Sequence, residues 1–400
     1  MFFHLLKPIW KRKFKNSMLS LEILLAFFVV FGLALMSVRY FQLYHQPLGF
    51  SYNNVWSVKL EMSNSGMLKN DPVFFENLKR SLLAMPEVEQ ISMVNHSPYS
   101  NSTWRTDVYL PDTQISYHTD LMSMSDTSFQ VLDMHIEEGR WFSEADEGAA
   151  MNPIVINWQL ANKMFPGQSA VGKLLANNKP DSKDLQLMRV TGVFADFRNK
   201  GEFMTPTPFA ITRFSPKSST DMWQVLLLKV RPGTLRAFEA RLSQQLKMIR
   251  NDIGYQISPM TDMRKSKLTE DTIPLMILAV IACFLLVMVA FGLFGVLWQK
   301  TTQRIPEIGL RRAVGANSGD IYRQIITEQL LLSSIAMLAG LVFLIQLPIT
   351  GVLGEAVNWT VFVIAILISM AVIYGISILC SLYPAWRASR LSPTEALHYE

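Results

Sequence analysis

Four long apolar stretches constrain this chain more than any other feature of its sequence. They cover residues 19–38, 273–298, 325–347 and 359–383, and each supplies the roughly 20 helical residues that cross a hydrocarbon core. Half of the 400 residues are hydrophobic and only 17% are charged, against about 25% in soluble domains. The sequence therefore predicts an α-helical membrane protein with four transmembrane helices, and it excludes a disordered chain or an ordinary soluble enzyme.

The first apolar stretch follows a basic leader, residues 1–18, and could belong either to a signal peptide or to a membrane anchor. Lys11, Arg12, Lys13 and Lys15 precede it, as in a secretory signal. The stretch is longer than the usual apolar core of a signal peptide, and residues 34–40 offer no clear pair of small residues for cleavage. We therefore expect a retained anchor.

Basic residues gather in three segments that four spans place on one side of the membrane: the leader, the loop 299–324 and the tail 384–400. The loop 348–358 contains Glu355 and neither Lys nor Arg. Short basic segments stay in the cytoplasm, so we expect both termini to be cytoplasmic, with residues 39–272 in the periplasm outside the inner (plasma) membrane.

The charge balance supports this topology. The segment from Tyr40 to Thr272 has 24 basic and 25 acidic residues, whereas the rest of the chain has 13 and 7. The net charge of +5 therefore reflects membrane topology, and a nucleic-acid partner is not needed to explain it.

The predicted outer segment has the patterns of a large mixed α/β domain. A strand, helix, strand order appears near its start and returns near its end, which suggests two halves of one subdomain with another subdomain inserted between them. The expected elements at the start are residues 54–62, 71–85 and 88–94; at the end 223–230, 235–249 and 255–258; and in the insertion the strands 114–124, 153–156, 188–194 and 208–213.

One segment has the spacing of a phosphate-binding loop, from Gly167 through Gly172 to Lys173. The next residue is Leu174, so the hydroxyl that would hold Mg²⁺ is missing, and a helix-like run, residues 158–165, precedes the segment where a strand is required. We expect a turn with glycines at positive φ, and no nucleotide site.

Searches for catalytic or metal-binding groups give no strong candidate. Four histidines lie in the outer segment without an H-x-x-x-H pair or a nearby cysteine, and neither a G-x-S-x-G nor an H-E-x-x-H motif occurs. Ser143 and Asp146 have the spacing of a helix cap, which is favoured over calcium binding at Glu144 and Glu147. Cys283 and Cys380 lie in apolar stretches, so no disulfide is expected. We predict a non-catalytic subunit with no cofactor or metal in this chain.

The loop 299–324 predicts a short helix from Pro306 to Gly315. Proline suits a first helical position, Glu307 lies in the positive first turn, Arg311 and Arg312 lie in the last turn, and glycine ends the helix. Such a helix either docks a cytoplasmic protein or only anchors the bundle at the membrane surface. After it, Ser318 is expected to cap a helix that continues into the third span.

Two cytoplasmic segments carry a resemblance to a known family. Residues 307–316 read E-I-G-L-R-R-A-V-G-A, and residues 383–400 read Y-P-A-W-R-A-S-R-L-S-P-T-E-A-L-H-Y-E. Residues 129–134, 138–140, 154–157, 162–173 and 190–197 of the outer segment agree with the same family. The sequence thus resembles the MacB/FtsX-like ABC transporter permeases over nearly its whole length.

The resemblance implies a four-span permease with a split porter-like βαβ subdomain, assembled as a homo- or heterodimer with cytoplasmic ABC ATPases that bind ATP and Mg. No complete phosphate loop is found here, so the ATPase is expected in another polypeptide. Membrane lipid, a periplasmic adaptor and an outer-membrane channel are further expected partners. The resemblance also implies an ATPase-docking coupling helix, formed by Pro306, Glu307, Ile308, Gly309, Leu310, Arg311, Arg312, Ala313, Val314 and Gly315.

Within that helix, Ile308, Leu310 and Val314 are the expected apolar contacts with the ATPase. Glu22 and Glu328 in the spans either pair with cations of the bundle or extend to the membrane interface. The implied function is mechanotransmission that drives efflux of periplasmic substrates such as peptides or antibiotics. Lipoprotein extraction, and activation of a periplasmic hydrolase as in the cell-division branch of the family, are the alternatives.

Overall fold

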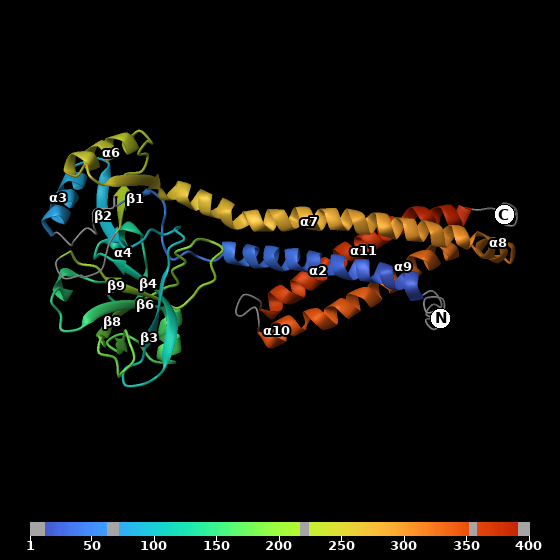
Figure 1. Ribbon diagram of the computed structural model, residues 1–400, viewed down its shortest axis with the longest axis horizontal. Coiled ribbons are helices and arrows are strands. Elements are labelled where there is room, and N and C mark those ends of the chain that lie inside the picture. Colours follow the sequence, from blue (N-terminus) through green and yellow to red (C-terminus); the bar gives the residue numbers. More distant parts are fainter. Residues whose placement is uncertain (1–12, 62–71, 217–223, 352–357, 391–400) are drawn as a thin grey trace. The chain divides into compact units, whose positions relative to one another are not determined.

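The computed structural model describes residues 13–61, 72–216, 224–351 and 358–390. The chain forms two compact units, which are described separately (Figure 1). The α/β unit runs from Leu43 to Asp271, and the helical unit combines the chain up to Gln42 with the chain from Thr272. The predicted leader lies outside the described residues as far as position 12.

The helical unit is built from four helices that are long and apolar enough to cross a membrane. Each contains one of the apolar stretches, because a backbone in hydrocarbon must satisfy its own hydrogen bonds. The four long helices are α2 (Lys13–Tyr44), α7 (Met260–Gln303), α9 (Ser318–Leu344) and α11 (Trp359–Arg390). Two short helices, α8 (Ile305–Ala313) and α10 (Gln346–Thr350), lie between them in the chain.

Side chains from all four long helices meet in one apolar core. Phe27 of α2 is fully buried there, together with Leu293 of α7, Met337 of α9 and Phe362 of α11. Gly340 of α9 lets the helices approach closely, since a Cβ at this position would lie 2.8 Å from a ring carbon of Phe27. Small residues at such contacts are typical of helix packing in membranes.

Helix α7 is longer than the apolar stretch 273–298 that it contains. It begins at Met260, and its first turns are polar. Lys267 pairs with Asp271 at 2.9 Å, one helical turn away, and pairs with this spacing stabilise a solvated helix. The apolar stretch therefore locates the membrane span but underestimates the length of helix α7.

The α/β unit contains one 11-stranded sheet. The strands and helices predicted from sequence patterns lie within a few residues of the observed ones, apart from Met62, Asp71 and Trp223, which lie outside the described residues; strands β3, β5 and β7 were not predicted. The elements are β1 (Val55–Glu61), α3 (Pro72–Leu83), β2 (Val88–Val94), β3 (Trp104–Tyr109), β4 (Ser116–Met124), α4 (Ser128–Val131), β5 (Ile136–Gly139), the 3₁₀ helix η1 (Glu144–Asp146), β6 (Asn152–Asn157), α5 (Trp158–Met164), β7 (Leu174–Ala176), β8 (Leu187–Phe194), β9 (Phe209–Arg213), β10 (Val225–Val230), α6 (Phe238–Ile249) and β11 (Gly254–Pro259).

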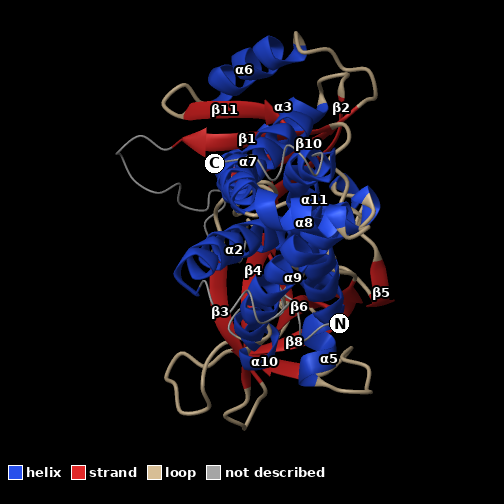
Figure 2. Cartoon of the chain, turned by 90° about the vertical axis from the view of Figure 1, so that its right-hand side faces the viewer, coloured by secondary structure: helices blue, strands red, loops and turns tan. Residues whose placement is uncertain are grey.

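The two ends of this unit form one interleaved subdomain. The strand order β11-β1-β10-β2 is antiparallel throughout, so β1-α3-β2 and β10-α6-β11 are split βαβ units that share neighbouring strands. Helices α3 and α6 pack on this part of the sheet, seen with its strands in red in Figure 2. The apolar faces of both helices supply its core, which includes Phe75 and Phe238.

The inserted strands continue the same sheet. β2 pairs with β4 through Val94 and Met124, and β4 pairs with β3 and with β9. Helix α5 packs with β6 and β8 around a separate core that includes Ile154 and Leu160. The chain thus has the predicted split subdomain with a second one inserted into it.

Candidate functional site

The predicted coupling helix is α8, whose ends are set by local sequence. Glu307 and Arg311 form an ion pair of 2.7 Å across one turn. Gly315 has a φ of +102°, a conformation that glycine adopts at little cost and that ends the helix. Asn317, which is extended, occupies the N-cap position of the following helix without a side-chain cap hydrogen bond, and Ser318 is the first helical residue; the predicted cap at Ser318 was one residue too late.

One face of α8 is buried against its own chain. Ile308 is 7% exposed and packs with Ile321 of α9 and Ala388 of α11. Gly309 is buried as well, and Arg311 donates a hydrogen bond of 2.8 Å to Gln324. Ile308 therefore anchors the helix to the bundle, which corrects its expected role as a partner contact.

The opposite face of α8 is open. Leu310 is 59% exposed and Val314 is 83% exposed, an unusual amount for apolar side chains beside charged ones. Glu307 and Arg311 are also exposed. The side chain of Arg312 lies outside the described part of the structure. The exposed residues form what we call the α8 face, namely Glu307, Leu310, Arg311 and Val314.

A carboxylate in α9 holds the turn that precedes α8. Glu328 pairs with Arg304 at 2.7 Å and accepts a hydrogen bond from Gln324, so of the two alternatives for Glu328 the structure shows pairing with a cation of the bundle. The carboxylate of Glu22 lies against α7 at Gly292, where an added Cβ would be 2.7 Å from its oxygens. The turn into α8 is thus tied to α9 through Arg304 and Glu328.

A second site lies within the α/β unit, at the end of α2. Arg198 is fully buried and donates hydrogen bonds to five backbone carbonyls. They belong to Leu43 (2.9 Å), Gln46, Pro47 (3.0 Å), Glu202 (2.7 Å) and Met204 (3.5 Å). The last carbonyls of a helix lack partners within it, so this guanidinium caps α2 and fixes the chain that leaves it.

The first turns of α7 attach to the same loop. Glu202 is 4% exposed, and its carboxylate pairs with Arg264 of α7 while its carbonyl accepts from Arg198. The guanidinium of Arg264 also lies 4.8 Å from the ring centre of Tyr52. We call Arg198, Glu202 and Arg264 the helix-end junction, because they bind the end of α2 and the start of α7 to one buried loop.

The electrostatics of the junction depend on burial. Desolvation lowers the pKa of Arg198, and the charges of Glu202 and Asp196 oppose this shift. A guanidinium remains charged in proteins, so the buried charge is sustained by the oriented carbonyls. Nearby, burial lowers the pKa of His96 to about 4, against the opposing charge of Asp120. Arg198 and Glu202 of the junction are therefore shielded from solvent by the folded domain.

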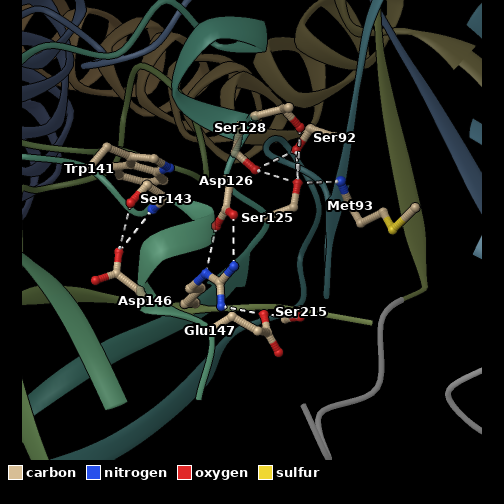
Figure 3. Close-up of polar contacts among 12 residues, drawn as sticks. Ser92, Met93, Ser125, Asp126, Ser128, Trp141, Ser143, Asp146, Glu147 and Ser215 are labelled. Atoms are coloured by element: carbon tan, nitrogen blue, oxygen red, sulfur yellow. Dashed lines mark hydrogen bonds and ion pairs between the residues drawn. The ribbon is translucent and has the colours of Figure 1, made fainter. Parts of the chain in front are cut away.

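A polar network connects the loop after η1, the residue Asp126 after β4, and the end of β9 (Figure 3). Arg213 binds Asp126 through two contacts of 2.8 Å and Glu147 at 2.7 Å, and Ser215 donates to Glu147 at 2.7 Å. Arg213 lines two cavities of about 390 Å³ each. Since the carboxylates of Asp126 and Glu147 are both paired with Arg213, the network has a structural role. It fastens the loop of η1 to β9.

Two predictions about this region are confirmed. Asp146 accepts a hydrogen bond of 2.9 Å from the backbone N–H of Ser143, as expected of a cap, although the helix is a single 3₁₀ turn. The loop that resembled a phosphate site follows α5, and Gly167 and Gly172 have φ values of +70° and +82°. Among the described residues, no group of His, Cys, Asp or Glu is arranged to hold a metal ion.

Two family models match this chain and show the family to which it belongs. Residues 23–245, more than half of the chain, match the MacB-like periplasmic core domain, and residues 279–393 match the FtsX-like permease C-terminal model. The chain belongs to the MacB/FtsX-like permeases. This permease is thus a membrane protein with an extracytoplasmic α/β domain, as its family and its four apolar helices indicate.

Curated relatives of this permease include two exporters. It is 25% identical over 327 residues to the pyoverdine export ATP-binding/permease protein PvdT of Pseudomonas aeruginosa, and 24% identical over 268 residues to the macrolide export ATP-binding/permease protein MacB of Bdellovibrio bacteriovorus. The alignments cover 79% and 66% of this permease but 46% and 41% of those proteins, so the chain spans less than half of their length.

The periplasmic region of MacB from Actinobacillus actinomycetemcomitans is a similar solved structure. It superposes with a TM-score of 0.40 at 14% identity, covering 56% of this permease and 97% of that chain.

Sequence reasoning about this permease found α8 and missed the helix-end junction. Arg198, Glu202 and Arg264 belong to no motif, and single charges in a polar loop are normally solvated. The only available signal was that Arg198 closely follows the strand predicted over residues 188–194, within an aromatic stretch that ends in Phe197. Burial, which gives these charges their role, arises from contacts between distant parts of the chain.

Proposed function

We propose that this permease transmits conformational change, driven by ATP hydrolysis in a cytoplasmic ATPase, to its α/β unit, and that this movement serves the export of periplasmic molecules. The helix-end junction carries the proposal. Because α2 and α7 are bound to one buried loop, displacement of either helix acts on the same rigid point of the α/β unit. The α8 face supplies an exposed apolar and charged surface on which the ATPase docks.

The energetic requirement is modest. Nucleotide shifts the permease between two arrangements only if the ATPase binds one of them more tightly, by about 1.4 kcal/mol for each tenfold change in population. Burying Leu310 and Val314 in one arrangement contributes on the order of 1.5 to 3 kcal/mol for each side chain. The α8 face is therefore large enough to bias the equilibrium.

The proposal includes a topology and a set of partners. Both termini and α8 are cytoplasmic, since their segments are basic, and the α/β unit is periplasmic. Two permease subunits assemble with ATPases that hold ATP and Mg, and an adaptor and an outer-membrane channel complete an export path. Export is favoured over lipoprotein extraction and hydrolase activation because the relatives described above are named as exporters.

Docking is tested with the ATPase that copurifies with the full chain from native membranes. Leu310→Glu with Val314→Glu places two charges on the α8 face, and we expect loss of copurification and of permease-stimulated ATP hydrolysis. Leu235→Glu is the matched control, because Leu235 is 77% exposed in the α/β unit. Unchanged copurification and stimulated hydrolysis in the double variant would refute the docking role of α8.

The identity of the copurified proteins separates the functional classes. An ATPase together with a periplasmic adaptor supports export, whereas a lipoprotein carrier or a murein hydrolase supports one of the alternatives. Cysteine substitutions at Leu235 and Val314, labelled in intact cells with a membrane-impermeant thiol reagent, test the topology. Labelling at Val314 and protection at Leu235 would contradict it.

A further inference from the structure

The contact between α7 and α11 contains an open apolar groove. Its volume is about 410 Å³, and alanines on α7 leave space that larger side chains would fill. The sulfur of Cys380 lies 3.4 Å from the carbonyl oxygen of Ala290, so the two helices are in contact beside the groove. The groove is lined by Leu33, Ala279, Ala282, Cys283, Leu286, Val287, Ala290 and Ile376.

Aromatic rings continue the same face of both helices beyond the groove. Tyr383 of α11 stacks on Trp298 of α7 with 5.9 Å between ring centres and an angle of 6° between planes, and on Phe294 at 6.2 Å. Tyr383 and Trp386 are about half exposed. Amphipathic rings in such a position are typical of the level at which lipid headgroups lie.

Two guanidinium groups cover these rings. Arg387 lies 4.4 Å from the ring centre of Trp298, and Arg390 lies 4.6 Å from that of Trp386. A stacked guanidinium keeps the N–H donors at its edge available for a planar or tetrahedral anion. Within the described residues neither group forms a hydrogen bond or an ion pair, so their donors have no anionic partner there.

Arg387 lines a notch of about 100 Å³ where α7, the start of α8 and α11 meet. The notch is small, and none of the described residues that line it is acidic. Its lining residues are Trp298, Thr301, Thr302, Ile305, Pro384, Arg387 and Ala388. A single anionic group fits its size and charge better than a helix from a protein partner.

The spacing between groove and notch matches one leaflet. Residues from Ala290 through Phe294 and Trp298 to Thr301 recur every three or four positions, so they follow one face of α7. Eleven residues separate Ala290 from Thr301, roughly 16 Å along a helix. Half of a hydrocarbon core is about 15 Å thick, so the acyl chain of a lipid whose headgroup lies at the notch reaches the groove at Ala290.

We propose that this contact between α7 and α11 binds an anionic phospholipid. Arg387 and the hydroxyl of Thr301 hold its phosphate, Arg390 adds a second positive charge, and an acyl chain extends to the near end of the groove at Ala290. The bound phosphate contacts Ile305, the first residue of α8, and thereby braces the turn from α7 into α8.

Native mass spectrometry of the full chain tests the site, with phosphatidylglycerol and phosphatidylcholine of the same acyl chains added to the detergent-solubilised protein. We expect preferential retention of phosphatidylglycerol. The preference should fall by about fivefold for each arginine removed in Arg387→Gln and Arg390→Gln, the usual effect of one basic residue at an anionic membrane surface. Arg236→Gln in the α/β unit is the control, because Arg236 is exposed and distant in sequence.

Three results would overturn the proposal. The first is equal retention of both lipids by the unaltered chain, and the second is an unchanged preference in the folded double variant. The third is efficient disulfide formation between the natural Cys283 residues of two copies, which would show that a second copy occupies the groove. A groove-filling variant, Ala290→Leu, provides an independent check, since it should reduce retention of both lipids while leaving their ratio unchanged. Glycerol phosphate should not compete, because it lacks the acyl chain.

Discussion

Substituting Arg198 tests the helix-end junction most directly. Arg198→Met keeps much of the apolar stem and removes all five hydrogen bonds to backbone carbonyls, three around the end of α2 and two in the loop of residues 202–204. A hydrogen bond contributes about 1 kcal/mol net, and a buried acceptor left without a donor costs on the order of 1 to 3 kcal/mol. Loss of five hydrogen bonds would therefore cost about 5 kcal/mol in total. Water that enters the site offsets part of this cost. We expect about 3 kcal/mol of local destabilisation.

Hydrogen exchange of the full chain in detergent measures this loss where it occurs. The amide of Arg198 donates to Leu48, and the amide of Gln46 donates to Leu43. A loss of about 3 kcal/mol should speed exchange of these amides by roughly a hundredfold. Amides of the buried strand β10, such as that of Leu227, should exchange as before.

The matched control is Arg189→Met, since Arg189 is an exposed arginine of the same domain. It should leave every exchange rate near its original value. If Arg198→Met also left the amides of residues 46 and 198 unchanged, the junction would contribute nothing to holding α2, and transmission of force through it would be wrong. Uniformly faster exchange throughout the sheet would show instead that Arg198 supports the whole domain.

Two further predictions concern burial. His96 has a pKa of about 4 in the folded state, whereas the unfolded chain binds a proton near pH 6.5. The free energy of unfolding should therefore fall by about 3 kcal/mol as the pH drops from 6.5 to 4. His96→Phe should lack this part of the pH dependence in denaturation experiments, and an equal pH dependence in both proteins would contradict the burial of His96. Gly340→Ala should destabilise the bundle by about 1 to 3 kcal/mol, because its Cβ would meet Phe27 at 2.8 Å; Gly295→Ala, with no atom within 4 Å of its Cβ, should cost nothing in the same thermal melt.

The elements of this fold could largely be predicted from the sequence because their signals are local. Apolar length locates four spans, since a bilayer has a fixed thickness. The alternation of strand and helix patterns locates the split βαβ units. Even the end of α8, two residues before Gly315, follows from one residue that tolerates positive φ.

Only the tertiary structure decided which side chains could carry the proposed mechanism. Ile308 reads as a contact residue in the sequence, yet α9 and α11 bury it, and the free surface of α8 consists of its neighbours. In the sequence, Arg198 and Glu202 are single charges of the kind that is normally solvated in a loop. In the structure, the end of α2 and the start of α7 help to bury them. The physical reason is that desolvation determines the effect of a charge. Desolvation depends on segments that are far apart in the chain and adjacent only after folding.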